Sequence, residues 1–94
     1  MDEAYENLAN AIIVQAAEDW KKAYKYLRKH ARSRSKSVKE NMVRAERTKI
    51  ECENFFRSAW FKTLTNADGE AIFSRLQKEA KEEYEHWHAS KVNH

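Results

Sequence analysis

Apolar residues in the N-terminal third of the chain recur at spacings of three and four, which places them on one face of a helix. The pattern predicts a first helix over about residues 3–30 and loses its periodicity in the serine-containing stretch that follows. We expect this stretch to form the first connection. The apolar face comprises Tyr5, Leu8, Ala9, Ile12, Ile13, Ala16, Trp20, Ala23, Tyr24 and Leu27.

A second helix is predicted over about residues 37–63. Ser37 and Glu40 have the spacing of a capping box at its start, because a serine side chain can cap the backbone amide three residues on while the glutamate reaches back. The apolar residues form two faces, which is typical of a helix with neighbours on two sides, or with one neighbour and a partner subunit. The main face comprises Val38, Met42, Ala45, Cys52, Phe56, Ala59, Trp60 and Leu64, and the second ridge comprises Val43, Ile50 and Phe61.

A third helix is predicted over about residues 66–90, with Thr65 as its cap and Asp68 at the capping-box position. Gly69 falls in the first turn, where it lowers helix stability, so we expect it to let another backbone or an aromatic ring come close. The apolar face comprises Ile72, Phe73, Leu76, Ala80, Tyr84 and Trp87.

These three helices are joined by short connections, which make sequential helices antiparallel neighbours. The sequence therefore predicts an all-α fold, a three-helix bundle built on a long antiparallel helical hairpin, in a single helical domain over residues 1–94. The composition agrees with this fold class, because the chain holds one Gly and no Pro, whereas hairpin and sandwich folds use those residues at most turns.

Charge is distributed unevenly along the chain, although the formal net charge is only +3. Residues 21–49 carry twelve basic side chains and two acidic ones, whereas residues 1–20 carry five acidic side chains and no Lys or Arg. In the predicted hairpin the basic segment forms a single tip. Lys36 and Lys39 oppose the dipole at the start of the second helix, so helix stability does not explain them.

Such a tip has two interpretations, a solvated surface or a site that binds an anion. On the second interpretation the cations bind the phosphate groups of a nucleic acid or a nucleotide, or an acidic protein face. The candidate residues for anion or nucleic-acid binding are Lys25, Arg28, Lys29, Arg32, Arg34, Lys36, Lys39 and Arg44.

Patterns typical of catalysis or metal binding are scarce. A glycine-rich phosphate loop is excluded, because Gly69 is the only glycine. His86 and His88 are two residues apart and point to different sides of a helix, whereas a helical metal pair needs a spacing of four. Cys52 lies on the main apolar face of the second helix, where a small buried hydrophobe is its expected role. We therefore predict no enzymatic activity, no metal site and no cofactor.

An aromatic segment over residues 54–61 holds more large rings than one helix face can bury. Phe56 and Trp60 are expected in the core. For Phe55 and Phe61 the core and a partner contact both stay open, because exposed aromatic patches tend to be contact sites. The candidate partner interface comprises Val43, Ile50, Phe55 and Phe61, and the surface expected for homo-oligomer formation is the ridge of Val43, Ile50 and Phe61.

Three segments of the chain resemble small helical proteins encoded by phages and prophages of Gram-positive bacteria. They are residues 5–13 (YENLANAII), residues 51–61 (ECENFFRSAWF) and residues 64–70 (LTNADGE). The resemblance spans most of residues 5–77. It implies a setting rather than an activity, because that family carries no established biochemical function. This sequence departs from the family at residues 32–36, which are more basic than the polar spacer of the relatives.

The resemblance and the lack of catalytic groups lead to one main functional expectation. It is a non-enzymatic phage or prophage accessory protein that binds and inhibits or redirects a host or phage protein, for example as an anti-CRISPR or other anti-defence inhibitor. The alternatives are a sequence-independent nucleic-acid-binding protein that uses the basic tip, and a nucleotide or cyclic-nucleotide sponge. The single cysteine, the acidic N-terminus and the lack of a membrane-length apolar run predict a cytoplasmic location in the bacterial host cell and no membrane partner.

Overall fold

The structure, a computed structural model, describes the backbone of residues 3–92 and the side chains of Ala4 and residues 6–87. Within residues 3–92 it is all-α and has no strand, which confirms the all-α part of the predicted fold. The elements are α1 (Glu3–Lys29), α2 (Lys36–Phe56), α3 (Ala59–Leu64) and α4 (Gly69–Val92).

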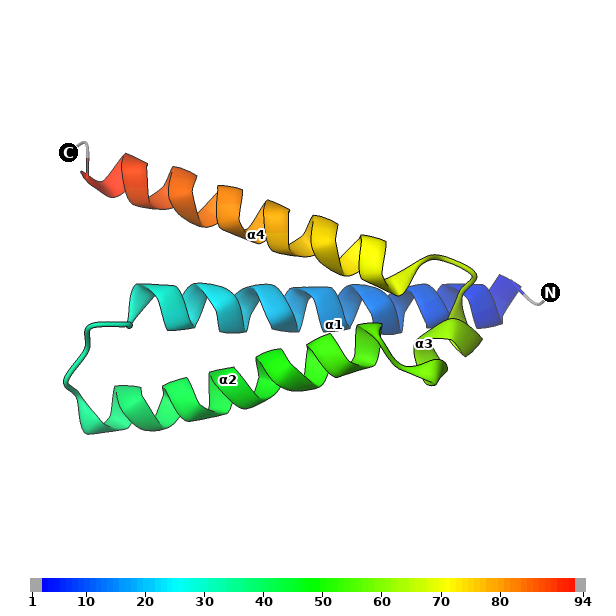
Figure 1. Ribbon diagram of the computed structural model, residues 1–94, viewed down its shortest axis with the longest axis horizontal. Coiled ribbons are helices and arrows are strands. Elements are labelled where there is room, and N and C mark those ends of the chain that lie inside the picture. The colour runs from blue at the N-terminus through cyan, green and yellow to red at the C-terminus, as the bar shows by residue number, and fades with distance from the viewer. Residues whose placement is uncertain (1–2, 93–94) are drawn as a thin grey trace.

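The three long helices run roughly along the same axis (Figure 1). α2 returns antiparallel along one side of α1, and α4 runs along the other side in the same direction as α1. α1 packs most extensively against α2, and α4 contacts both. The short α3 lies at the end where α2 finishes and α4 starts, so it carries the chain from one side of α1 to the other. None of the described helices has an apolar stretch long enough to cross a lipid bilayer.

The predicted helix over residues 37–63 is divided in the structure into α2 and α3. Ser58 stabilises the break, because its side chain bonds to nearby backbone groups that a continuous helix would use. The hydroxyl donates a hydrogen bond to the carbonyl oxygen of Phe55 (2.7 Å) and accepts one from the backbone N–H of Phe61 (3.1 Å). Ser58 has an extended backbone (φ −81°, ψ 159°) and is the N-cap of α3. The prediction of one continuous second helix is therefore wrong.

Helix α2 starts one residue before the predicted boundary. Ser35 is its N-cap in place of the predicted Ser37, because Ser35 has an extended backbone (φ −65°, ψ 130°) and its hydroxyl accepts a hydrogen bond from the backbone N–H of Val38 (3.4 Å). The hydroxyl of Ser33 accepts a further hydrogen bond from the backbone N–H of Ser35 (3.2 Å). Two serines therefore order the end of the connection.

Helix α4 starts at Gly69, later than the predicted residue 66. The carboxylate of Asp68 accepts hydrogen bonds from the backbone N–H groups of Glu70 (3.0 Å) and Ala71 (3.4 Å), which caps the first turn. Thr65 instead ends α3, as its C-cap. The predicted cap at Thr65 is thus wrong by about one turn, and Asp68 takes that role.

The core lies toward the α3 end of the molecule. The buried apolar residues are Ala9, Trp20, Ala23, Cys52, Phe56, Phe61, Phe73, Leu76 and Ala80. Trp20 packs edge-on against Phe73, with ring centroids 5.5 Å apart. Among the described side chains, none on α1 after Ala23, on α2 before Cys52 or on α4 after Ala80 is buried. The last turn of α1, the α1–α2 connection and the first four turns of α2 therefore contain no buried side chain.

Gly69 is in close contact with two neighbouring elements. A Cβ atom at this position would overlap the carbonyl oxygen of Phe56 at the end of α2 and would lie 3.2 Å from Cδ1 of Phe61 in α3. The φ angle of Gly69 is not positive, so the fold uses its lack of a side chain rather than its conformational freedom. The prediction that Gly69 admits a backbone and an aromatic ring is confirmed.

Candidate functional site

The C-terminal end of α1, the connection after it and the N-terminal end of α2 lie at the same end of the molecule (Figure 1). Five basic side chains of the connection and of the first turns of α2 are exposed and make no ion pair with any described residue. Glu40 is the only acidic residue between positions 30 and 45. We call this group of five the basic tip: Arg32, Arg34, Lys36, Lys39 and Arg44.

The start of α2 adds to the positive potential of the basic tip. Its first turn begins with Lys36 and contains no acidic residue, whereas the partial positive charge at a helix N-terminus favours acidic side chains there. The N-terminus of α2 and the lysine ammonium groups therefore both favour a bound anion at this end of the helix.

Two of the predicted anion-binding residues on α1 lie over aromatic rings of α4 instead. The guanidinium carbon of Arg28 lies 4.6 Å from the centroid of the Tyr84 ring. The ammonium nitrogen of Lys29 lies 5.5 Å from the centroid of the Trp87 ring. Such cation–π contacts stabilise exposed sites by about 0.5 to 1 kcal/mol. Both cations therefore contribute to the packing of α4 on α1.

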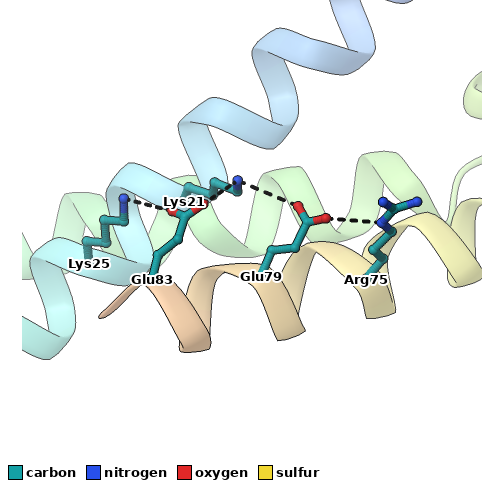
Figure 2. Close-up of polar contacts among 5 residues, drawn as sticks. All are labelled: Lys21, Lys25, Arg75, Glu79 and Glu83. Atoms are coloured by element: carbon teal, nitrogen blue, oxygen red, sulfur yellow. Dashed lines mark hydrogen bonds and ion pairs between the residues drawn. The ribbon is translucent and has the colours of Figure 1, made fainter. Parts of the chain in front are cut away.

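Salt bridges also join α1 to α4 (Figure 2). Glu83 on α4 pairs with Lys21 (3.2 Å) and Lys25 (3.0 Å), and Lys21 lies 3.8 Å from Glu79. Arg75 extends the network along α4 by pairing with Glu79 (3.0 Å). Hydrogen bonds from Lys25 and Lys21 lower the pKa of Glu83 below its ordinary value, which keeps the carboxylate charged. Lys25, a predicted anion-binding residue, is therefore already engaged.

Sequence reasoning missed this network, although the spacing carries a signal for it. Lys21 and Lys25 are four residues apart on α1, as are Glu79 and Glu83 on α4. Each pair therefore lies on one helix face. Two opposite charge pairs with matched spacing indicate a contact between helices, but the spacing does not identify which helix faces which.

A pocket of about 240 Å³ lies between α1 and α4. Its lining combines two basic side chains, one acidic side chain and two aromatic rings: Lys25, Lys29, Glu83, Tyr84 and Trp87. The side chain of Trp87 is 38% exposed, so part of its ring surface is accessible from solvent. Sequence reasoning placed both aromatic residues on the apolar face of the last helix and did not foresee the pocket.

The four residues predicted as a partner interface do not share one surface. Phe61 is 1% exposed, because the break at Ser58 turns it into the core. It is therefore removed from the interface and from the predicted self-association ridge. Phe55 is half-buried, and its ring packs edge-on against that of Phe61, with centroids 5.6 Å apart. Val43 and Ile50 are exposed, at 61% and 47%.

Trp60 is the exposed ring of the aromatic segment. Its side chain is 55% exposed, so the prediction that it lies in the core is wrong. Its ring packs edge-on against Phe55, with centroids 5.3 Å apart. Phe56 is buried, which confirms its predicted place in the core.

Cys52 is buried on α2, as predicted. Burial, assisted by the nearby carboxylates of Asp19, Glu51 and Glu53, raises the pKa of its thiol to about 11. The thiol therefore stays protonated at neutral pH and is a poor nucleophile and metal ligand. Within the part of the chain that the structure describes, no three His, Cys, Asp or Glu side chains gather in a way that could hold a metal ion. The side chain of His88 lies outside the described residues.

Comparison with known proteins gives no match: no family model, no curated protein and no solved structure matches the chain. The resemblance to phage and prophage proteins therefore stays a prediction.

Proposed function

We propose that the protein binds nucleic acid through the basic tip, without preference for base sequence. The observation that carries this proposal is the group of five exposed basic side chains that have no ion pair within the described part of the chain. Clustered cations bind phosphates with release of counterions, and this contribution to affinity does not depend on base identity.

The position of two lysines favours a ligand over a merely solvated surface. Lys36 and Lys39 lie in the first turns of α2, where a positive side chain is unfavourable because of the helix dipole. A bound phosphate offsets that repulsion, because it interacts favourably with the lysines and with the helix N-terminus at once.

The proposal is tested by fluorescence anisotropy of a labelled oligonucleotide over a series of salt concentrations. Five phosphate contacts predict that the logarithm of the association constant falls with the logarithm of salt with a slope of about −3.5 on a single strand. The double variant Arg32→Gln with Arg34→Gln should bind more weakly. Its salt slope should be smaller in magnitude by about 1.4, because it removes two phosphate contacts.

The matched control is the double variant Lys62→Gln with Lys78→Gln. It removes the same charge from exposed positions on α3 and on the N-terminal half of α4, outside the basic tip. We expect its salt slope to equal that of the wild type. A wild-type slope near zero, or equal losses of affinity in the two double variants, contradicts the proposal.

A second candidate function is the binding of a partner protein, with inhibition or redirection of that partner. Val43 and Ile50 favour it, because both are exposed and lie seven residues apart on one face of α2. The exposed apolar surface is smaller than the sequence predicted, because three of the four rings of the aromatic segment pack within the protein: Phe55, Phe56 and Phe61.

The double variant Val43→Ser with Ile50→Ser separates the two functions. It should keep the oligonucleotide affinity and the salt slope of the wild type. If α2 carries a partner-protein site, the wild type should retain one bacterial protein in stoichiometric amount from a lysate, and this variant should not. Equal retention by wild type and variant counts against the α2 surface.

A further inference from the structure

The pocket between α1 and α4 lies near the end of α1 that leads into the basic tip. Lys29, near the end of α1, lines the pocket, and Arg32 of the basic tip follows three residues later. A strand with a phosphate on Arg32 is therefore within reach of the pocket. The pocket volume of about 240 Å³ exceeds that of an indole side chain, which is close in size to a purine base. One unpaired base fits in this space.

The lining supplies a stacking surface with a cation beside it. Trp87 is 38% exposed, and the ring of Tyr84 also lines the pocket. The ammonium nitrogen of Lys29 lies 5.5 Å from the centroid of the Trp87 ring. Proteins that bind single strands combine aromatic stacking surfaces with cations that contact the backbone, and every base offers a π face for this purpose.

The one acidic side chain of the pocket does not make it repel a strand. Glu83 pairs with Lys21 and Lys25, so its negative charge is already balanced by two cations. The lining, with two basic side chains and one acidic one, therefore carries an excess of positive charge.

We infer that this pocket receives an unpaired nucleobase, and that the ligand of the basic tip is single-stranded nucleic acid rather than duplex. The inference rests on the proposed function and names the class of its ligand. Bases of a duplex are paired and stacked on one another, so they enter a side pocket only after those contacts break. In a single strand, the base stacks on Trp87 while Arg32 binds the adjacent phosphate.

Binding to a labelled single strand is compared with binding to a duplex of equal length at one salt concentration. The wild type should bind the single strand more tightly. The Trp87→Ala variant should lose about tenfold in single-strand affinity, the loss typical of one stacked base, and should keep its duplex affinity. The Trp87→Phe variant should retain most of the single-strand affinity, because it keeps an aromatic face.

The matched control is Trp60→Ala, because Trp60 is also an exposed indole but lies on α3, outside the basic tip. It should change neither affinity. In this variant the indole emission should fall when the single strand is added, since Trp87 stacks on a base while Trp20 is buried. This measurement needs no substitution at Trp87, so it tests the pocket even where Trp87→Ala unfolds the protein.

The outcomes distinguish the inference from the proposed function. Two results would contradict base binding in the pocket: equal losses of single-strand affinity in Trp87→Ala and Trp60→Ala, or unchanged emission of Trp87 on binding. Either result leaves salt-dependent binding to the basic tip intact. Tighter binding of duplex than of single strand would also contradict base binding in the pocket, but not the proposed function. The absence of salt-dependent binding to both probes overturns the proposed function, and the inference with it.

Discussion

Gly69, the first residue of α4, lies against the end of α2 and against α3. A methyl group there would overlap the carbonyl oxygen of Phe56 and crowd the ring of Phe61. Gly69→Ala should therefore lower the free energy of unfolding by about 1 to 3 kcal/mol, the usual cost of overpacking, measured by urea denaturation. Ala71→Gly, the reverse change at an exposed position of the same turn, should cost about 1 kcal/mol or less. A Gly69→Ala protein more stable than the wild type would contradict the close contact.

Cys52 links stability to alkaline pH. The pKa of its thiol is raised from 9.0 to about 11 in the folded protein, with burial as the first cause. Between these pH values the unfolded chain releases the thiol proton and the folded protein keeps it, so stability falls as pH rises, by about 2 to 3 kcal/mol in all. Urea denaturation at pH 8 and pH 11 should therefore give a larger loss for the wild type than for Cys52→Ala. Equal losses would show that the thiol is not buried as described.

Glu83 is the main polar contact between the helices α1 and α4. Glu83→Gln should lower the free energy of unfolding by about 0.5 to 1 kcal/mol, the usual range for an exposed ion pair, and more at low salt than at high salt. Hydrogen bonds from Lys25 and Lys21 lower the pKa of this carboxyl. Its contribution is therefore present above the ordinary glutamate pKa and is lost as pH falls through the lowered value. The stability of the wild type should therefore approach that of the variant as the pH falls, which thermal unfolding from neutral to acidic pH measures.

The control for this prediction is Glu82→Gln on the adjacent position of α4. Glu82 is exposed and has no ion pair with any residue that the structure describes. We expect its substitution to leave stability unchanged within about 0.5 kcal/mol. Equal effects of the two substitutions would mean that total charge, rather than the contact between α1 and α4, determines stability.

At the scale of elements, apolar spacing predicted the long helices well and the break between α2 and α3 not at all. Phe56 and Trp60 continue the spacing of the main face across Ser58, so the pattern shows no interruption. The break depends on hydrogen bonds of the Ser58 hydroxyl, which leave no trace in an apolar pattern. Because the chain changes direction there, Phe61 enters the core and Trp60 is exposed, the reverse of what a continuous helix predicts for Trp60.

At the scale of the whole molecule, buried side chains lie toward the α3 end, and this predicts a gradient of local stability. Helix α2 has no buried side chain before Cys52, so its N-terminal turns open without exposing core surface. In hydrogen–deuterium exchange, amides near Met42 should exchange faster than amides near Phe56. Uniform protection along α2 would contradict this gradient and would indicate that the helix opens only with the whole fold.

Clustering of charge along the chain predicted which basic residues gather at one end, but not which of them remain open. Lys25, Arg28 and Lys29 belong to the same basic segment as Arg32 and Arg34. The first three contact residues of α4 that lie more than fifty positions further along the chain. Local patterns carry no information on such a long-range contact. Only the structure therefore separates the cations that contact α4 from those that do not.

The lack of buried side chains around the α1–α2 connection bears on how this protein can diverge. Residues 30–35 contribute none of the core, and changing the length of a surface loop costs little free energy. The residues that hold the helices together, such as Trp20 and Phe73, are therefore separate from those proposed to contact the ligand, such as Arg32. A lineage can change the length and charge of this connection, and with it two of the five basic-tip residues, while the core that joins the helices stays the same.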